Sequence, residues 1–189
     1  GASVGAVTRY TVANVTEVDA SAAPCARGTY TITASAGPNG SVSPAGATSV
    51  DHAAEQAYTI TPAAHYHVAD VLVDGASVGA VTNFTFTNVT EAHTIAASFA
   101  IDTYTITASA GAHGSVSPAG ETQVDHGADL AFTITATTHY HVVDVLVDEA
   151  SVGAVTSFAF SNVTEHHTLS VTFAIDTYAI TASAGANGS

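Results

Sequence analysis

The chain has 189 residues, of which 10% are charged, and it carries a formal net charge of −14 with only two basic residues, Arg9 and Arg27. A nucleic acid or an anionic membrane would repel such a surface, so we expect no nucleic-acid partner. No stretch approaches the roughly 20 apolar residues that span a bilayer, so we expect no membrane insertion. The single cysteine, Cys25, leaves no internal disulfide.

The sequence is dominated by a repeat of 74 residues. Residues 30–103 and 104–177 are identical at 53 of 74 positions without a gap. Residues 1–29 correspond to the end of this unit in a divergent form, and residues 178–189 correspond to its start. Because a fixed period is the signature of a repeat array, we expect two full repeats flanked by two partial ones. We also expect the sequence to be a segment of a longer array.

Each unit shows short strands separated by turn residues. In chain order, the first copy predicts strands or short extended pieces over residues 30–36, 41–43, 57–61, 65–74, 84–86 and 93–99. Apolar and polar residues alternate in 30–36 and in 93–99, which is typical of half-buried strands. The longest apolar run, 65–74, is predicted to be a buried strand. Residues 48–57 are polar and mixed, and their 51–57 part is the nearest candidate for a helical turn.

These patterns predict an all-β fold made of tandem small β-rich modules of 74 residues each. The alternative is a β-grasp-like α+β module with one short helical turn near residues 51–57. The turn after 65–74 carries Gly75 in the first copy and Glu149 in the second, so a positive φ is not expected to be required there. The short link at 101–103 is expected to hold the modules close together. The predicted core of the first copy consists of Ile32, Tyr58, Ile60, Val71, Val73, Phe84, Phe86, Ile95 and Phe99.

The ordered motifs of each unit resemble a known family. They are Tyr-Thr-Ile-Thr-Ala-Ser-Ala-Gly (30–37), Gly-Ser-Val-Ser-Pro-Ala-Gly (40–46), Tyr-Thr-Ile-Thr-Pro (58–62), Tyr-His-Val-Ala-Asp-Val-Leu-Val-Asp-Gly (66–75), Phe-Thr-Phe-Thr-Asn-Val-Thr (84–90) and His-Thr-Ile (93–95). This series is similar to the divergent internalin-B-type B-repeat family of bacterial and archaeal surface proteins. The resemblance implies small β-rich modules strung in tandem, without catalytic residues. It also implies that His67 and His93 serve the architecture of the module.

Histidines recur at equivalent positions of both copies and form a candidate metal site. His65 and His67 flank Tyr66 on the predicted strand, so they are expected on one face of it. Together with His93 and His52 they offer imidazole ligands suited to Zn²⁺, Cu²⁺ or Ni²⁺. The second copy offers His139, His141, His167 and His126. The alternative, which we favour, is that these are ring-packed or surface histidines, since nothing resembles a Cys/His framework. No cofactor is expected other than a divalent metal ion bound by them.

Several asparagines match the N-glycosylation pattern, namely Asn14, Asn83, Asn88 and Asn162. The alternative, which we favour, is that they begin turns between strands. Asp70, Asp74 and Asp102 are candidate calcium ligands, but a solvated acidic face is favoured because no dense Asp-x-Asp loop occurs.

The sequence favours a structural role over catalysis. No Gly-x-Ser-x-Gly elbow is present, and so small a unit offers little room for a cleft, so we expect no enzyme. We expect a non-catalytic extracellular repeat module that forms a stalk, fibre or filament of a secreted or cell-surface protein, with copies of itself as partners. The alternatives are a histidine-based metal-binding module and an adhesin repeat that binds a glycan or a cell-surface receptor.

Overall fold

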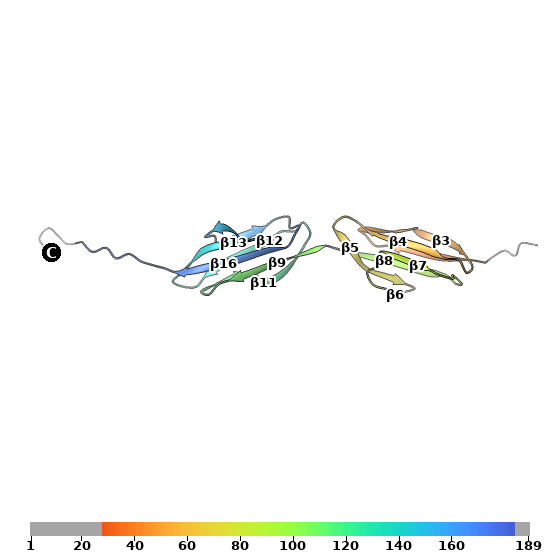
Figure 1. The fold of residues 1–189 in the computed structure, drawn as a ribbon, viewed down its shortest axis with the longest axis horizontal. Helices are drawn as coiled ribbons and strands as arrows, with labels where there is room; N and C mark the ends of the chain where they lie inside the picture. Colours follow the sequence, from red (N-terminus) through yellow and green to blue (C-terminus); the bar gives the residue numbers. More distant parts are fainter. Residues whose placement is uncertain (1–27, 184–189) are drawn as a thin grey trace, which may run out of the picture.

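The computed structural model describes residues 28–183, which contain two similar modules built from β-strands (Figure 1). The strands of the first module are β1 (Thr29–Ala36), β2 (Gly40–Ser43), β3 (Gly46–Asp51), β4 (Gln56–Pro62), β5 (Tyr66–Val73), β6 (Ala76–Ser77), β7 (Asn83–Phe86) and β8 (His93–Ile101). Those of the second are β9 (Thr103–Ala110), β10 (Gly114–Ser117), β11 (Gly120–Asp125), β12 (Leu130–Ala136), β13 (Tyr140–Val147), β14 (Ala150–Gly153), β15 (Ser157–Phe160) and β16 (His167–Ile175). The described residues contain no helix, so the all-β prediction is confirmed.

Each module is a sandwich of a larger and a smaller sheet. The first module has a five-stranded sheet in the order β3-β1-β8-β5-β6 and a three-stranded sheet in the order β2-β4-β7. The second module repeats this arrangement with β11-β9-β16-β13-β14 and β10-β12-β15. The apolar residues of each strand face the space between the two sheets, because alternate side chains of a strand point to opposite faces. Residues 51–57, the candidate for a helical turn, form the end of β3, the β3–β4 connection and the start of β4.

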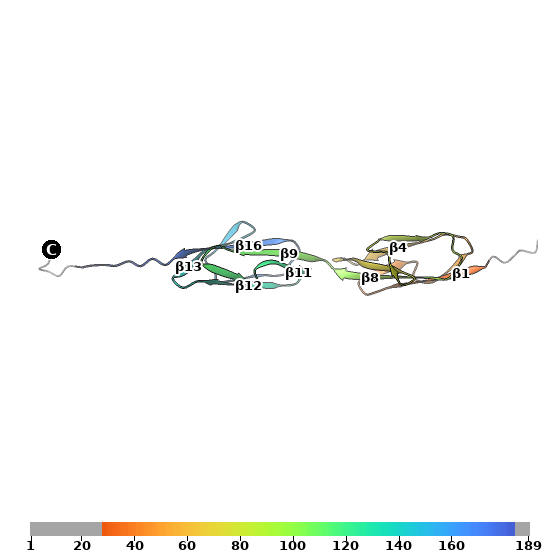
Figure 2. The ribbon, with the colours of Figure 1, turned by 90° about the horizontal axis from the view of Figure 1, so that it is seen from below.

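The first and last strands of each module lie side by side and run in the same direction. β1 pairs with β8 in parallel, with Ile32 beside His93 and Ala36 beside Ala97. The chain therefore enters the module at one end and leaves it at the other. Only one residue, Asp102, separates the end of β8 from the start of the next strand, β9. As a result the two modules lie end to end along the long axis of the molecule in both views (Figures 1 and 2).

The core of the first module contains most of the residues that the sequence predicted. Ile32, Tyr58, Ile60, Val71, Phe86 and Ile95 are all buried, and Val73, Phe84 and Phe99 are half-buried and pack against them. The prediction omitted the buried residues Ala34, Val42, Val50, Val68, Val89 and Ala97. The second module has an equivalent cluster, centred on Ile106, Phe132, Val145 and Leu169.

The prediction for residues 65–74 was wrong in two respects. β5 is half-buried rather than buried, because only one of its faces meets the core. In addition, His65 precedes the strand in a left-handed conformation with φ 65°. His65 and His67 therefore do not share a face of one strand. The polar stretch 48–57 also contains part of a strand, β3, whose one buried residue is Val50.

The turn between β5 and β6 corrects another prediction. Asp74 and Gly75 both have positive φ, at 51° and 81°, and their equivalents Asp148 and Glu149 do too, at 49° and 66°. A positive φ is therefore required in both copies, although one of them carries glutamate at the second position. A left-handed conformation costs a residue with a side chain roughly 1–2 kcal/mol more than it costs glycine.

Replacement of that glutamate is expected to stabilise the second module. Glu149→Gly removes the left-handed strain but increases the conformational entropy of the unfolded chain. We therefore expect a net gain of about 1 kcal/mol in the free energy of unfolding. Gly75→Glu in the first module is the matched control and should lower stability by a similar amount. Hydrogen exchange of the core amides of each module measures both effects. A loss of stability in Glu149→Gly would contradict this account of the turn.

Candidate functional site at the junction of the modules

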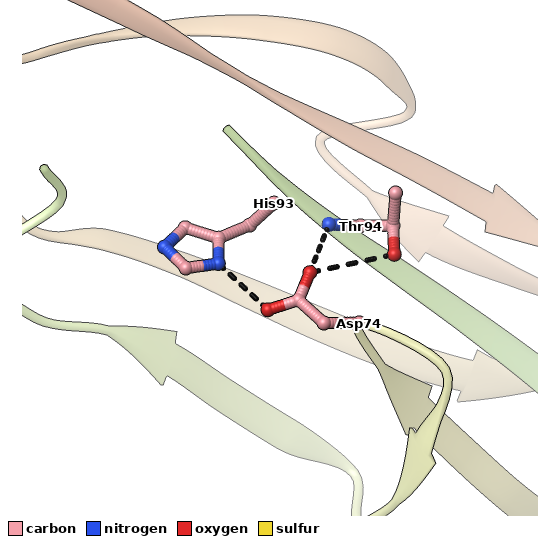
Figure 3. A network of polar contacts seen from close by, with 3 residues as sticks. All are labelled: Asp74, His93 and Thr94. Atoms are coloured by element: carbon pink, nitrogen blue, oxygen red, sulfur yellow. Dashed lines mark hydrogen bonds and ion pairs between the residues drawn. The ribbon is translucent and has the colours of Figure 1, made fainter. Parts of the chain in front are cut away.

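The first module carries a histidine–aspartate pair at the β5–β6 turn (Figure 3). His93 Nδ1 donates to Asp74 Oδ2 at 2.7 Å, and the Thr94 backbone N–H donates to Asp74 Oδ1 at 2.7 Å. The His93 ring also stacks on Phe86, with 4.8 Å between ring centroids. The pair thus ties the turn to the start of β8. The second module repeats it with His167, Asp148, Thr168 and Phe160.

These contacts perturb both aspartates. The hydrogen bond from His93, followed by that from the Thr94 amide, lowers the pKa of Asp74. Burial pushes the pKa of Asp148 upward, but the hydrogen bonds from the Thr168 amide and His167 outweigh it, so that this pKa is lowered too. A carboxyl group with a lowered pKa stabilises the folded state above its unfolded pKa. That contribution is lost as the pH falls through the folded value.

We therefore expect the paired aspartates to contribute to acid unfolding. Below about pH 4, where an unfolded aspartate takes up its proton, each module should lose the stabilisation that these carboxylates provide. The variant Asp74→Asn/Asp148→Asn should show a shallower fall of the urea midpoint between about pH 5 and pH 2. The variant Asp51→Asn/Asp125→Asn makes the same change of net charge at exposed positions and is the matched control for the effect of charge alone. Equal slopes for both variants would contradict the prediction.

A single residue, Asp102, connects the two modules. Its backbone N–H donates to the carbonyl oxygen of His65 in the first module, and its own carbonyl accepts the backbone N–H of His126 in the second, at 2.9 and 2.8 Å. Its carboxylate accepts a hydrogen bond from His67 Nδ1 at 2.9 Å. Asp102 is therefore bonded to both modules and leaves no free linker between them.

Two histidine rings stack across the same junction. His65 and His126 lie with their ring centroids 3.7 Å apart and their planes at 8°. The His126 ring centroid also lies 5.8 Å from that of Tyr104, with the two planes tilted by 51°. His126 is half-buried, whereas its equivalent in the first module, His52, is exposed. The His65 ring of the preceding module covers His126, which accounts for the lower exposure of His126.

The outer end of each module makes hydrogen bonds equivalent to those on one side of this junction. At the outer end of the second module, the Asp176 backbone N–H donates to the carbonyl oxygen of His139 at 2.8 Å, and His141 Nδ1 donates to the Asp176 carboxylate at 2.9 Å. At the outer end of the first module, the His52 backbone N–H donates to the carbonyl oxygen of Gly28 at 2.8 Å. A hollow of about 340 Å³, lined by residues 51–54, lies beside His52. Each outer end therefore reproduces hydrogen bonds that one half of the junction makes.

The histidines predicted as metal ligands lie in separate places. His67 and His93 are near opposite ends of the β5–β8 pair, where each binds an aspartate, while His65 lies at the junction and His52 in the β3–β4 turn. The second copy separates His139, His141, His167 and His126 in the same way. Within residues 28–183, no three His, Cys, Asp or Glu side chains form a group that could hold a metal ion. Metal binding stays a prediction without a preformed site in this region.

The remaining candidate residues lie on the surface or outside the described range. Asn83, Asn88 and Asn162 are exposed, and the last two have left-handed backbones with φ 52° and 51°, as expected of turn asparagines. Asn14 and Cys25 lie outside residues 28–183, and glycosylation stays a prediction. The sequence reasoning placed Asp176 in a short junction, like Asp102, but did not single out Tyr104 or Asp148 for a role. A signal for the aspartate–histidine pairs was available, since Asp74 and Asp148 each precede a histidine by 19 residues.

Comparisons with protein-family models, with curated proteins and with solved structures found no match. The resemblance to the B-repeat family therefore stays a prediction. A search of the described part of the chain for helices long and apolar enough to cross a membrane found none. The functional argument accordingly depends on the geometry of the modules and their junction.

Proposed function

We propose that this chain is a non-catalytic, extracellular structural repeat region that forms part of a stalk or fibre of a secreted or cell-surface protein. The observation that carries the proposal is the path of the chain: it enters and leaves each module at opposite ends, because β1 and β8 are parallel neighbours. Each added repeat then lengthens the molecule along one axis. The direct bonding of Asp102 to both modules supports a stiff connection between them.

The surface chemistry also supports assembly of copies of the repeat. Only 10% of the residues are charged, while the net charge is −14, so neighbouring rods would meet through neutral polar surfaces under a weak mutual repulsion. Salt and divalent cations screen such repulsion. We therefore expect lateral bundling of the rods to increase with ionic strength.

Electron microscopy of the native protein tests the proposal. We expect unbranched rods whose length increases in proportion to the number of 74-residue repeats, and antibody labelling of intact cells should place them at the surface. Light scattering of the same material supplies its mass. A short, compact, monomeric particle that contains no further repeats would contradict the proposed function.

A further inference from the structure

The strands that carry the chain into and out of each module are hydrogen-bonded to each other. β1 and β8 pair in parallel over five positions, from Ile32 beside His93 to Ala36 beside Ala97. β9 and β16 pair over the equivalent five positions of the second module. Tension applied to the two ends of a module pulls these neighbours in opposite directions along their common axis. The hydrogen bonds between them are then loaded in shear, all at the same time.

Shear differs physically from peeling. When two strands are peeled apart from one end, their hydrogen bonds break one after another, and each adds only a small net stability. When the strands slide past each other, the bonds must lengthen together, so the barrier contains several of them at once. An antiparallel pair such as β9–β11, where Thr103 lies beside Asp125, would be peeled by a force applied across those two residues.

The parallel pair is also protected from water on the side that faces the core. Ile32, Ala34, Ile95 and Ala97 lie beneath it and are at most 5% exposed. Each strand has a further neighbour, β3 beside β1 and β5 beside β8, so that the pair occupies the interior of the sheet. The Gly37 backbone N–H extends the contact by donating to the Ala97 carbonyl at 2.9 Å. Water therefore reaches the stretched bonds only from the exposed face of the sheet.

Force would pass from module to module without a slack segment. β8 ends at Ile101 and β9 begins at Thr103, so only Asp102 lies between the two strands. Since β8 and β9 are the loaded strands of consecutive modules, a pull on the chain reaches both parallel pairs directly. The load path is the same in each repeat because the strand register is the same.

We infer that each module is a mechanical clamp, in which the parallel pair β1–β8, or β9–β16, resists stretching, and that the chain bears tensile load. The clamp is a property of the single module. Its biological use rests on the proposed function as a stalk or fibre. A stalk that anchors a surface protein under flow or traction needs modules that resist unfolding when pulled by their ends.

Optical tweezers with two pulling directions on the same module test the clamp. In the full chain with Cys25→Ser, DNA handles are attached either at Thr103→Cys and Thr177→Cys or at Thr103→Cys and Asp125→Cys. All three anchor residues are exposed, so both variants should show the same urea midpoint as the Cys25→Ser parent. The first pair loads β9 and β16 in shear, and the second peels β9 from β11.

We expect the unfolding force of the second module to be several-fold higher in the shear direction than in the peeling direction at the same loading rate. Equal forces, or a lower force in shear, would overturn the clamp. This outcome is separate from the imaging test. Rods made of mechanically weak modules would leave the proposed function standing, and a compact native particle made of strong modules would leave the clamp standing.

Discussion

Truncation of Ile32 to alanine is expected to destabilise the first module severely while leaving the second module folded. Ile32 is 0% exposed, at the centre of β1, and packs in the cluster formed by both sheets. Removal of an isoleucine side chain from such a site costs about 2–5 kcal/mol, because the transfer free energy is lost and a cavity is left behind. A module of this size buries a modest core and is only marginally stable.

The chain contains a matched control for this substitution. Ile180 lies in an equivalent sequence context after the second module but is 96% exposed. Ile180→Ala should therefore leave the unfolding of both modules unchanged. Amide hydrogen exchange, resolved by module, is the measurement. If Ile32→Ala cost no more than Ile180→Ala, the assignment of β1 to the core would be wrong.

The second large effect is expected at Gly40, where β2 meets the ring of Phe99 from the opposite sheet. A Cβ atom at Gly40 would overlap the ring atoms of Phe99, and one at Gly114 would overlap Phe173 in the same way. Overpacking of this kind costs about 1–3 kcal/mol because the ring or the strand must move. We therefore expect Gly40→Ala to lower the free energy of unfolding of the first module by this amount.

A double-mutant cycle with Phe99→Ala isolates the overlap. Loss of the ring alone should be strongly destabilising, towards about 3 kcal/mol, since Phe99 is half-buried. Addition of Gly40→Ala to that variant should cost little, because the overlapping atoms are gone. Gly37→Ala is the control, since a Cβ there meets its nearest atom, the Ala97 carbonyl oxygen, at 3.5 Å. Equal effects of Gly40→Ala with and without the ring would rule out the proposed overlap.

Much of the fold was predictable because most strands have one face on the core. In residues 30–36 and 93–99 the apolar residues alternate with polar ones, and the structure buries Ile32 and Ile95 accordingly. β3 was not predicted as a strand, because Val50 is its one buried residue and a single residue shows no alternation. The left-handed turns at His65 and Glu149 were also missed, since neither position carries glycine.

The arrangement of the candidate site was less predictable. Alternation shows which face of a strand a histidine occupies, but it does not show which strand lies opposite. Pairing of β1 with β8 brings together residues about 60 positions apart, and only that pairing reveals the straight path of the chain. Likewise, the partner of His67 is Asp102, 35 residues away. A ring stack between His65 and His126 depends on both modules being in place.

Small-angle X-ray scattering of the full chain in solution tests most directly whether the modules are held in line. The structure predicts an elongated particle whose cross-section is that of one β-sandwich, with a shoulder in the pair-distance distribution at the separation of the two module centres. The variant His126→Ala removes the ring stack and should broaden that shoulder, whereas His139→Ala should not. A compact particle with the two modules side by side would contradict the account.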